Sequence, residues 1–375
     1  MRAGFWPSWC LLLLLAACTG VTPSPEKPAL TPVDFADLPG WNDDRQSEAI
    51  PAWARSCSVL IKGPRARDWR AACAALKNVP PHDDAAARAF FELYFRPYAA
   101  VSNDGFEGLF TGYYEPELKG SLRRTKRYNI PLYARPRDLV SVDLGLFRPE
   151  WQHQHIAGKV EGARLVPYDD RALIEKNSLK GRARVLLWVD DPVDAFFLAI
   201  QGSGRVRLTN GQIVRIGYDQ ANGRAYVALG RVLADLDAIE RPVTMQKIRA
   251  WLAAHPDRAD EVMNLNPSYV FFRKIRGDGP VGAEGVALTT KRSLAVDPSF
   301  VPLGAPVWLD AFDGAGAPLE HLVIAQDTGG AIKGPVRGDL FWGAGFEAAE
   351  EAGTMQGRGR YFILLPKSVT PDAGQ

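Results

Sequence analysis

The chain has 375 residues, of which 46% are hydrophobic and 23% charged, and 45 Lys and Arg against 43 Asp and Glu leave a formal charge of +2. This length predicts two or three domains, or one domain with a large insertion. The composition excludes disordered, collagen-like and coiled-coil proteins. Without a basic excess or a basic stripe, we expect no nucleic-acid partner. Aromatic residues make up 10% of the chain and are expected to line a groove or to pack on sheets.

The first residues have the pattern of an export signal. Arg2 precedes the apolar run Leu11–Leu15, which is too short to span a bilayer, so residues 1–17 are predicted to be a signal peptide. The run ends in LAAC, which resembles a bacterial lipobox and predicts that Cys18 is lipidated. A plain signal peptide with an incidental cysteine is the alternative. Thr19 follows, as in lipoproteins sorted to the periplasmic face of the outer membrane of Gram-negative bacteria. Residues 18–40 are expected to form a Pro-rich tether.

Two cysteines remain in the body of the chain. Cys57 and Cys73 lie on successive segments with helical spacing, and an exported protein reaches an oxidising compartment, so a disulfide between them is favoured. Two buried thiols are the alternative. No metal site is expected, because two cysteines and five scattered histidines do not supply a ligand set. His153 and His155 would share a strand face without a third ligand, and we interpret them as solvated.

Asp44–Ala100 is predicted to be helical. Apolar residues recur at helical spacing from Ile50 to Leu60 and from Trp69 to Leu76. Asp84 has the position of an N-cap before a third helix at Ala85–Phe95.

The middle of the chain, from Phe110 to Arg231, is rich in strand and turn signals. Arg205–Leu208 and Gln212–Ile216 flank Asn-Gly and predict a hairpin with a type I′ turn. Further strands are expected at Arg184–Val189 and Ala195–Ile200, and helices at Thr244–His255 and Asp257–Asn264.

The last third contains short apolar runs separated by Gly- and Pro-rich turns, which is typical of a small barrel. One helix is expected at Phe346–Met355. The predicted strands are Val286–Leu288, Val307–Leu309, His321–Ala325 and Tyr361–Leu365.

One group of candidate binding residues combines TGYYEPE, which begins at Thr111, with FLAIQGSGRVRL. The Gly-Ser-Gly at 202–204 is a weak match to a dinucleotide-binding loop, since no helix follows it. Gln201 and Ser203 offer neutral hydrogen-bonding groups, and Tyr113 and Tyr114 offer rings for stacking, which together suit a sugar. A bulge or a tight bend at the glycines is the alternative, and the residues alone do not decide between the two.

The second group is QDTGGAIKGPVRGDLFWG, with Asp327 and Asp339 beside apolar runs and Lys333 and Arg337 between them. In a partly dry cleft, a carboxyl group has a raised pKa and can act as an acid at neutral pH. The alternative is a turn cap at Asp327 and an ion pair at Asp339, which local spacing by itself favours. Serine-, thiol- and metal-dependent hydrolases lack their motifs here.

Five segments in order resemble the membrane-bound lytic murein transglycosylase A family. They are GYYEPEL, IQGSGRVRL, NPSYVFF, the stretch from LAVDP to VPLGAPVWLD, and the stretch from AQDTGGAIKG to GDLFWGAG. The resemblance runs from about Phe110 to Pro366, whereas the helical region before it has no matching motif. It implies a mainly β fold, with a double-psi β-barrel and an inserted second β-rich domain that leave a groove between them.

The expected division of the chain follows from that resemblance. It places a helical N-terminal part of the barrel domain at 41–109, the inserted glycan-binding domain at 110–257, the C-terminal barrel part at 258–368 and a tail at 369–375. The C-terminal part resembles a three-aspartate domain, with Asp297, Asp327 and Asp339 at its acidic positions. The resemblance implies that Asp339 is the catalytic acid and Asp327 its close partner. Residues implied to bind the glycan are Thr111, Tyr113, Tyr114, Gln201, Gly202, Ser203, Asp297 and Lys333.

The implied reaction cleaves the β-1,4 bond between N-acetylmuramic acid and N-acetylglucosamine in peptidoglycan. The C6 hydroxyl of the muramic acid attacks its own C1, so a single carboxyl group serves first as acid and then as base. No cofactor is expected. A noncatalytic peptidoglycan-binding lipoprotein and a water-using murein glycosidase are the alternatives. Whether the protein also binds partner proteins of murein synthesis or hydrolysis stays an open question at this point.

Overall fold

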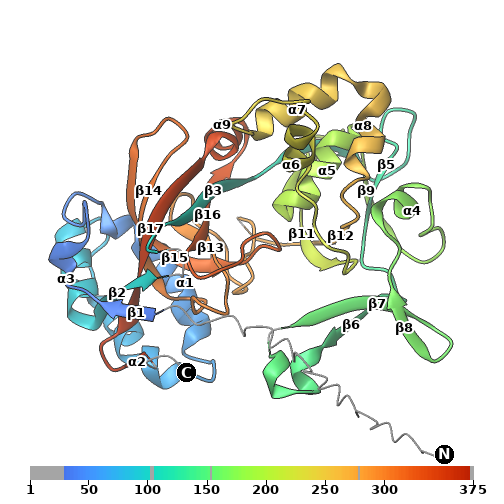
Figure 1. Ribbon diagram of the computed structural model, residues 1–375. Coiled ribbons are helices and arrows are strands. Elements are labelled where there is room, and N and C mark those ends of the chain that lie inside the picture. The colour runs from blue at the N-terminus through green and yellow to red at the C-terminus, as the bar shows by residue number, and fades with distance from the viewer. Residues whose placement is uncertain (1–28, 102–104, 153, 278, 372–375) are drawn as a thin grey trace, which may run out of the picture.

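The protein consists of a barrel with a helical N-terminal part and a second, β-rich unit beside it (Figure 1). This computed structural model describes residues 29–101, 105–152, 154–277 and 279–371. The predicted signal peptide, residues 18–28 of the predicted tether with Cys18, and His153 lie outside the described residues. In the part of the chain that the structure describes, no helix is long and apolar enough to cross a membrane.

The barrel is a sheet that closes on itself. Around it, β3 pairs with β16, β16 with β13, β13 with β15, β15 with β14, β14 with β17, and β17 again with β3. The β3–β16 and β13–β15 pairs are parallel, and the others are antiparallel. The strands are β3 (Gly108–Glu115), β13 (Ser293–Ala295), β14 (Pro306–Phe312), β15 (Pro318–Asp327), β16 (Arg337–Ala344) and β17 (Gln356–Pro366).

Two further strands extend the barrel at β17, and one helix follows β16. β2 (Phe95–Val101) pairs with β17, and β1 (Ala29–Pro32) pairs with β2. α9 (Phe346–Thr354) connects β16 to β17. Trp308, Phe110 and Tyr361 are fully buried in the barrel core. Burial of such large side chains, each worth roughly 1.5–3 kcal/mol or more, is the main reason why these strands stay together.

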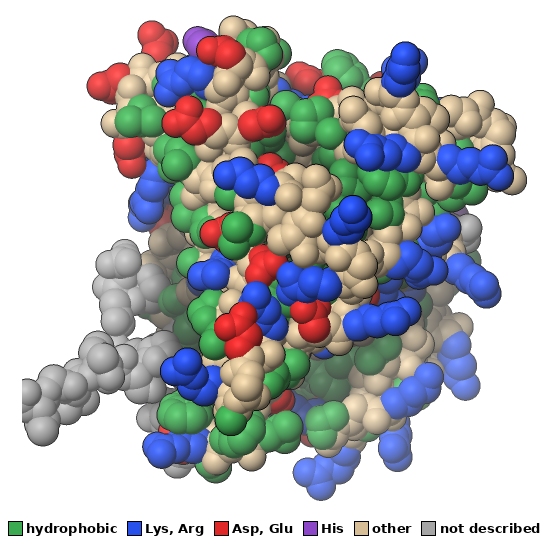
Figure 2. Space-filling view, turned by 90° about the vertical axis from the view of Figure 1, so that its right-hand side faces the viewer, with side chains coloured by type: hydrophobic (Ala, Val, Ile, Leu, Met, Phe, Trp, Pro, Cys, Tyr) green, Lys and Arg blue, Asp and Glu red, His purple; other side chains and the backbone are tan. Residues whose placement is uncertain are grey.

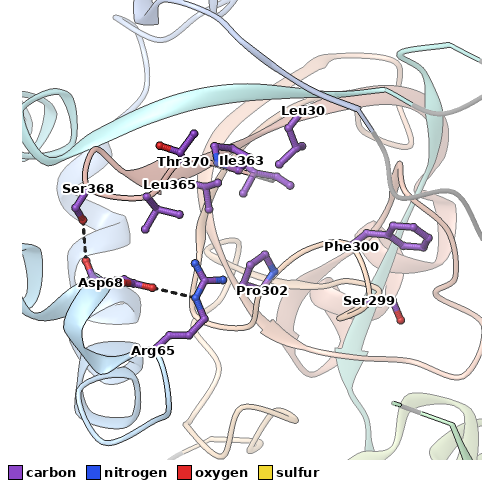
Figure 3. Close-up of a pocket in the computed structure, with 12 residues that line it drawn as sticks. Leu30, Arg65, Asp68, Ser299, Phe300, Pro302, Ile363, Leu365, Ser368 and Thr370 are labelled. Carbon is purple, nitrogen blue, oxygen red and sulfur yellow. Dashed lines mark hydrogen bonds and ion pairs between the residues drawn. The ribbon is translucent and has the colours of Figure 1, made fainter. Parts of the chain in front are cut away.

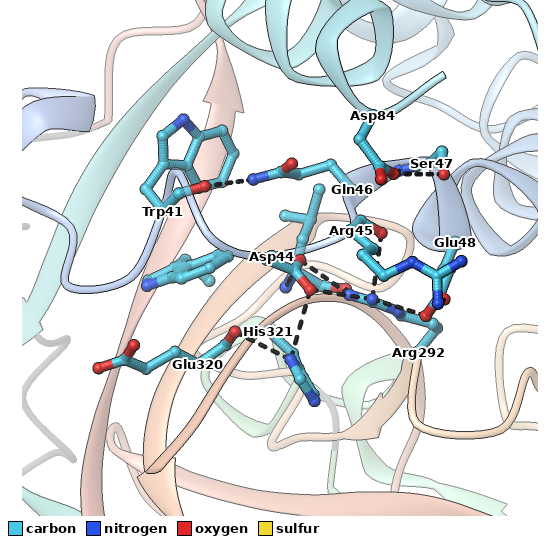
Figure 4. A network of polar contacts seen from close by, with 12 residues as sticks. Trp41, Asp44, Arg45, Gln46, Ser47, Glu48, Asp84, Arg292, Glu320 and His321 are labelled. Carbon is cyan, nitrogen blue, oxygen red and sulfur yellow. Dashed lines mark hydrogen bonds and ion pairs between the residues drawn. The ribbon is translucent and has the colours of Figure 1, made fainter. Parts of the chain in front are cut away.

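The N-terminal helices cover one side of the barrel, and a buried ion pair joins the segment before them to the barrel. They are α1 (Ile50–Leu60), α2 (Ala66–Ala75) and α3 (Asp84–Tyr94). The guanidinium of Arg292 donates to both carboxylate oxygens of Asp44, at 2.8 and 2.9 Å, and to Glu48 at 2.9 Å (Figure 4). Burial by itself would raise the pKa of Asp44, but hydrogen bonds from His321 and Arg292 lower it to about 2. We call this network the seam.

Cys57 of α1 and Cys73 of α2 form a disulfide, which is one of the two arrangements that the sequence left open. Beside it, the rings of Trp53 and Trp69 lie 5.8 Å apart, and Phe95 packs against both. The two helices therefore present their apolar faces to each other as the helical spacing predicted.

The second unit contains a six-stranded sheet and a three-stranded sheet. In the larger sheet the order is β12-β11-β10-β4-β9-β5, and in the smaller one β6-β7-β8. The strands are β4 (Glu117–Ser121), β5 (Ile130–Tyr133), β6 (Val140–Asp143), β7 (His155–Glu161), β8 (Arg164–Pro167), β9 (Val185–Val189), β10 (Ser203–Leu208), β11 (Ile213–Ala221) and β12 (Val270–Lys274). The helices are α4 (Arg171–Glu175), α5 (Pro192–Gln201), α6 (Leu229–Asp235), α7 (Met245–Ala254) and α8 (Pro256–Met263).

The outer face of the second unit carries many Lys and Arg side chains, which are most numerous toward the right of Figure 2. Several of them are paired with carboxylates; for example, Arg182 contacts Asp138 and Asp169, both at 2.7 Å.

One predicted strand is a helix. Ala195–Ile200 lies within α5, whose N-cap Asp191 accepts hydrogen bonds from the N–H groups of residues 193 and 194. Pro192 opens this helix, and Gly202 ends it in a left-handed conformation with φ 79°. Six apolar residues fit a buried strand and a buried helix equally well, and here the capping residues decide.

Other differences are local. The helix expected at Ala85–Phe95 begins at Asp84, and Asp83 is its N-cap. Val286–Leu288 forms only an isolated bridge, between Val281 and Ala287. β10 and β11 form the predicted hairpin. Among the described residues of its turn only Gly211 has a positive φ, 83°, so the turn is not type I′.

The boundaries of two expected segments also differ from the structure. Part of the segment expected to be a tether is folded, because β1 pairs along β2 and Leu30 and Phe35 pack against the core. Pro32 is compatible with this pairing, since β1 is an edge strand. The six-stranded sheet extends past residue 257, because β12 supplies its edge strand.

Candidate active site

A cavity of about 610 Å³ lies between the barrel and the second unit. The barrel contributes Asp327, Arg337 and Asp339 to its lining. The second unit contributes the segment 201–203, at the end of α5, and Tyr226. The cavity therefore brings together most of the residues of the two groups that the sequence singled out.

The strand register explains why the two aspartates meet. β13 lies between β15 and β16, and its residue Ala295 is paired with Asp327 on one side and with Asp339 on the other. On the far side of β16, Asp339 is paired with Thr111 of β3. The strand pairing thus places Asp327, Asp339 and Thr111 next to one another, although their strands are distant in the sequence.

Both oxygens of Asp327 accept hydrogen bonds from the protein. Its Oδ1 accepts from the N–H groups of Ala283 and Thr328, both at 2.9 Å. Its Oδ2 accepts from the hydroxyl of Tyr113 at 2.8 Å. Three donors hold this carboxyl group in one orientation, so its oxygens are poorly placed to exchange protons with a substrate.

Asp339 has a different environment. Its Oδ1 accepts a hydrogen bond from the Thr111 hydroxyl at 2.6 Å. Its Oδ2 has no hydrogen-bond partner within the described ranges, and the residue lines the cavity. Asp339 is therefore the aspartate of the pair with an oxygen available to a bound molecule.

Burial raises the pKa of both aspartates. Burial raises the pKa of Asp339 to about 6; the Thr111 hydrogen bond and the Arg337 charge act in the opposite direction, and Asp327 acts in the same direction as burial. Burial also raises the pKa of Asp327, while its three hydrogen bonds oppose the rise. A group with a pKa near 6 is partly protonated near neutral pH and can both donate and accept a proton.

The end of α5 forms the opposite wall of the cavity. Gln201, Gly202 and Ser203 all line it, as the sugar-binding interpretation expects. Gln201 Oε1 accepts from the backbone N–H of Tyr114 at 3.0 Å, which ties this wall to β3. A side chain built at Gly202 would meet no atom within 4 Å, so the backbone there is open to a ligand. Gly202 is a helix C-cap rather than a strand bulge.

The other predicted binding residues lie outside the lining. Tyr113 and Tyr114 are buried, and Tyr113 packs against Phe341 with ring centroids 5.3 Å apart. Asp297 is buried and accepts from the N–H groups of Ser299 and Gly334, at 3.1 and 3.0 Å, which fastens the loop between β15 and β16. Lys333 is exposed on that loop. Tyr113 thus contacts Asp327 instead of presenting its ring to the cavity.

Sequence reasoning missed several lining residues. Tyr218 and Tyr226 line the cavity in place of the expected tyrosine pair, and the Asp339 charge adds to the burial that raises the pKa of Tyr226. The backbone N–H of Ala283 has no signature in the sequence, since every residue except proline supplies one. Arg337 was weighed only as an ion-pair partner.

A second cavity, of about 580 Å³, lies between α2 and the barrel (Figure 3). Its charged residues satisfy each other, because Arg65 donates to Asp68 at 3.0 Å. It contains no pair of carboxyl groups among its lining residues. The cleft between the two units is therefore the better candidate for chemistry.

Comparison with known proteins agrees with this choice. The family model described as the MltA specific insert domain matches residues 109–273, and that described as the 3D domain matches residues 292–365. A crystal structure of MltA from Neisseria gonorrhoeae is 36% identical, with 94% of this chain and 99% of that chain covered and a TM-score of 0.78. The chain belongs to the membrane-bound lytic murein transglycosylase A (MltA) family.

Further relatives support the assignment to the MltA family. A membrane-bound lytic murein transglycosylase from Agrobacterium tumefaciens is 34% identical, covers 90% of this chain and 98% of its own, and has a TM-score of 0.81. Membrane-bound lytic murein transglycosylase A of Escherichia coli is 30% identical over 71% of this chain and 67% of its own length. For its counterpart in Vibrio cholerae, which is 32% identical, the match covers 52% of this chain and 55% of the relative. The fold is accordingly the double-psi β-barrel with an inserted domain found in MltA structures.

Proposed function

We propose that the protein is a peptidoglycan lytic transglycosylase. In this proposal it cleaves the β-1,4 bond between N-acetylmuramic acid and N-acetylglucosamine and leaves a 1,6-anhydro-muramyl end. Membership of the MltA family supports the reaction class. The observation that carries the assignment of residues is the contrast between Asp327, which has three donors, and Asp339, which keeps one oxygen open to the cavity.

Asp339 acts twice in the proposed reaction. Its protonated carboxyl group gives a proton to the glycosidic oxygen as the bond from that oxygen to C1 breaks. The C6 hydroxyl of the same muramic acid then bonds to C1 and gives its proton to the Asp339 carboxylate. No water is consumed, and the acid is regenerated. Because the attacking hydroxyl belongs to the substrate, its effective concentration at C1 is high.

A water-using glycosidase fits the site less well. Such enzymes need a second carboxylate that is free to attack the sugar or to activate water. Asp327 is the neighbouring carboxylate, and its three hydrogen bonds occupy both oxygens. In our proposal, Asp327 instead supplies fixed negative charge that stabilises the oxocarbenium-like transition state.

The glycan strand binds along the cleft in this proposal, with the wall at 201–203 donating and accepting hydrogen bonds. Tyr113 orients Asp327, and Asp297 holds the loop that carries Lys333. Tyr218 and Tyr226 are the lining rings that a sugar can contact. No cofactor takes part in the proposed chemistry.

The test is digestion of purified sacculi by the detergent-solubilised protein, followed by mass spectrometry of the released muropeptides. We expect products that are lighter than the hydrolysis products by one water molecule, with anhydro ends. Release of reducing ends would show a hydrolase. Binding without release would show a noncatalytic peptidoglycan-binding lipoprotein. Either of these results would contradict the proposal.

We also propose that Cys18 carries the lipid that anchors the protein at the periplasmic face of the outer membrane. The lipobox-like LAAC supports this, and the relatives are named as membrane-bound. Cys18→Ser is expected to yield unlipidated protein that no longer fractionates with membranes once its signal is removed, yet still cleaves murein. Membrane retention of that processed variant would contradict the anchor.

A further inference from the structure

Arg337 lies beside the aspartate that we assign as the acid, yet it forms no ion pair with that residue among the described contacts. One nitrogen of its guanidinium, NH2, donates to Thr111 Oγ1 at 2.9 Å. The other, NH1, donates to the carbonyl of Leu109 at 3.1 Å and to the carbonyl of Gly338. Arg337 is half-buried and is thus fixed to both β16 and β3.

The direction of the next hydrogen bond follows from the chemistry of the three groups. A guanidinium has donors only, so Thr111 Oγ1 must be the acceptor toward Arg337. A hydroxyl that accepts a hydrogen bond from a cation becomes a stronger donor and a poorer acceptor for a second hydrogen bond. The single hydroxyl hydrogen of Thr111 therefore points to Asp339 Oδ1, which lies 2.6 Å away.

We infer that Arg337 is a positioning residue for the proposed reaction. It fixes the Thr111 hydroxyl as a donor to Asp339 Oδ1, so that Oδ2, the oxygen without a protein partner, carries the proton into the cavity. This inference rests on the proposed function and extends it. Without the guanidinium, the Thr111 hydroxyl is free to accept a hydrogen bond from protonated Asp339 Oδ1, and the acid proton is then divided between Oδ2, which faces a substrate in this proposal, and Oδ1, which does not.

Several titratable groups face Asp339, and Arg337 is the cation among them. β15 presents Asp327, β3 presents the Tyr113 hydroxyl, and the loop after β11 presents Tyr226. Arg337 is the cation that acts on Asp339. The Thr111 hydrogen bond and the Arg337 charge both oppose the rise in the pKa of Asp339 that burial causes, so losing either one should raise that pKa further.

The test is a double-mutant cycle with Thr111→Val and Arg337→Met. The maximal rate is measured on sacculi at a pH low enough to keep Asp339 protonated in every variant, which removes the direct effect of charge on protonation. We expect each single change to lower kcat by about tenfold and to leave KM nearly unchanged, because the hydroxyl contacts the acid. If Arg337 acts through Thr111, the double variant is no slower than the slower single variant.

Thr111→Ser keeps the hydroxyl and should restore the rate. Arg224→Met is the matched control, because Arg224 is also half-buried and donates to a backbone carbonyl, that of Tyr168, away from the cleft. It should leave kcat unchanged. If Arg337→Met fails to fold in thermal melts, Arg337→Lys replaces it in the cycle. Independent losses that multiply to about a hundredfold in the double variant would overturn the inference.

A second measurement does not depend on turnover. Titration of the Asp339 carboxyl by ¹³C NMR should show a higher pKa in Thr111→Val, and Arg337→Met should raise the pKa by less in that background than in the unchanged protein. Equal increments in the two backgrounds would overturn the inference. If the unchanged protein forms no anhydro ends but shows this coupling, the proposed reaction fails while the hydrogen-bond arrangement stands.

Discussion

The seam and the cleft each contain an aspartate close to an arginine, buried at the seam and half-buried in the cleft, and the two aspartates have opposite pKa shifts. At the seam, Arg292 donates to both oxygens of Asp44, the N–H of Leu322 donates to one of them, and the pKa falls to about 2. In the cleft, Arg337 donates to Thr111 rather than to Asp339, and burial raises the pKa of Asp339 to about 6.

The difference teaches how the same pair of residue types can serve stability or chemistry. A carboxylate whose two oxygens are both paired with a guanidinium stays ionised and fastens two parts of the chain together. A buried carboxyl group with one oxygen unpaired is costly to ionise, and for that reason it keeps a proton that it can give away. The pKa of the aspartate therefore depends on whether the nearby arginine donates its hydrogen bonds to the carboxylate, as Arg292 does, or to another group, as Arg337 does.

The largest effect is expected from Asp339→Asn. The amide is nearly isosteric with the carboxyl group, so folding should be intact, but it cannot donate or accept the transferred proton. We expect a rate loss of about 10⁴ or more on sacculi, since one group serves both steps. Release of anhydro muropeptides is the measurement.

Asp327→Asn is the matched comparison. Its three donors include two backbone N–H groups that an amide oxygen can still satisfy, so we expect a clearly smaller loss. If folded Asp339→Asn kept near-full activity while Asp327→Asn were inactive, the two roles would have to be exchanged.

Arg292→Met should have the largest effect on stability. It leaves the Asp44 carboxylate buried without its main partner, which costs roughly 3–5 kcal/mol of unfolding free energy. Because the pKa of Asp44 is lowered in the folded state, its contribution is present above about pH 4 and is lost as the pH falls toward about 2. Denaturant melts across this range measure both effects.

Arg360→Met is the surface control for that experiment. Arg360 also contacts a carboxylate, that of Asp310, at 2.5 Å, but its side chain is 45% exposed. We expect a change within about 1 kcal/mol. Equal losses of unfolding free energy in Arg292→Met and Arg360→Met would show that the buried ion pair at the seam stabilises the fold no more than an exposed one.

A smaller, opposite effect is expected for the stability of Asp339→Asn. The folded-state pKa of about 6 lies above the ordinary value of 3.8, so the wild-type fold loses stability as the pH rises from about 4 to about 6. The variant lacks this loss and should be more stable above pH 6, by up to about 3 kcal/mol. Below about pH 4 the difference should vanish, which provides the internal control. Melts that show no such divergence would contradict the raised pKa.

Much of the architecture could be predicted from the sequence. Helical spacing identified α1 and α2, and the order of motifs identified the barrel and the inserted unit. The prediction failed at Ala195–Ile200, because a short apolar run does not distinguish a buried helix from a buried strand. Asp191, Pro192 and Gly202 were available as capping signals for that helix.

The site was only partly predictable. Motifs named both aspartates, but the hydrogen bonds that separate their roles come from strand register and from the backbone of Ala283, which leave no signature in residue type. Tyr113 and Tyr114 were both expected to present their rings to the glycan, but residues that follow one another along a strand face opposite sides of the sheet. Tyr113 instead contacts Asp327, and both tyrosines are buried.

The contrast between seam and cleft is tested most directly by one titration. Aspartate side chains are labelled with ¹³C at the carboxyl carbon, and the signals of Asp44 and Asp339 are assigned from Asp44→Asn and Asp339→Asn. We predict pKa values of about 2 for Asp44 and about 6 for Asp339 in the same folded protein. A pKa for Asp339 at or below the ordinary 3.8 would leave it ionised at neutral pH and would contradict its role as the acid.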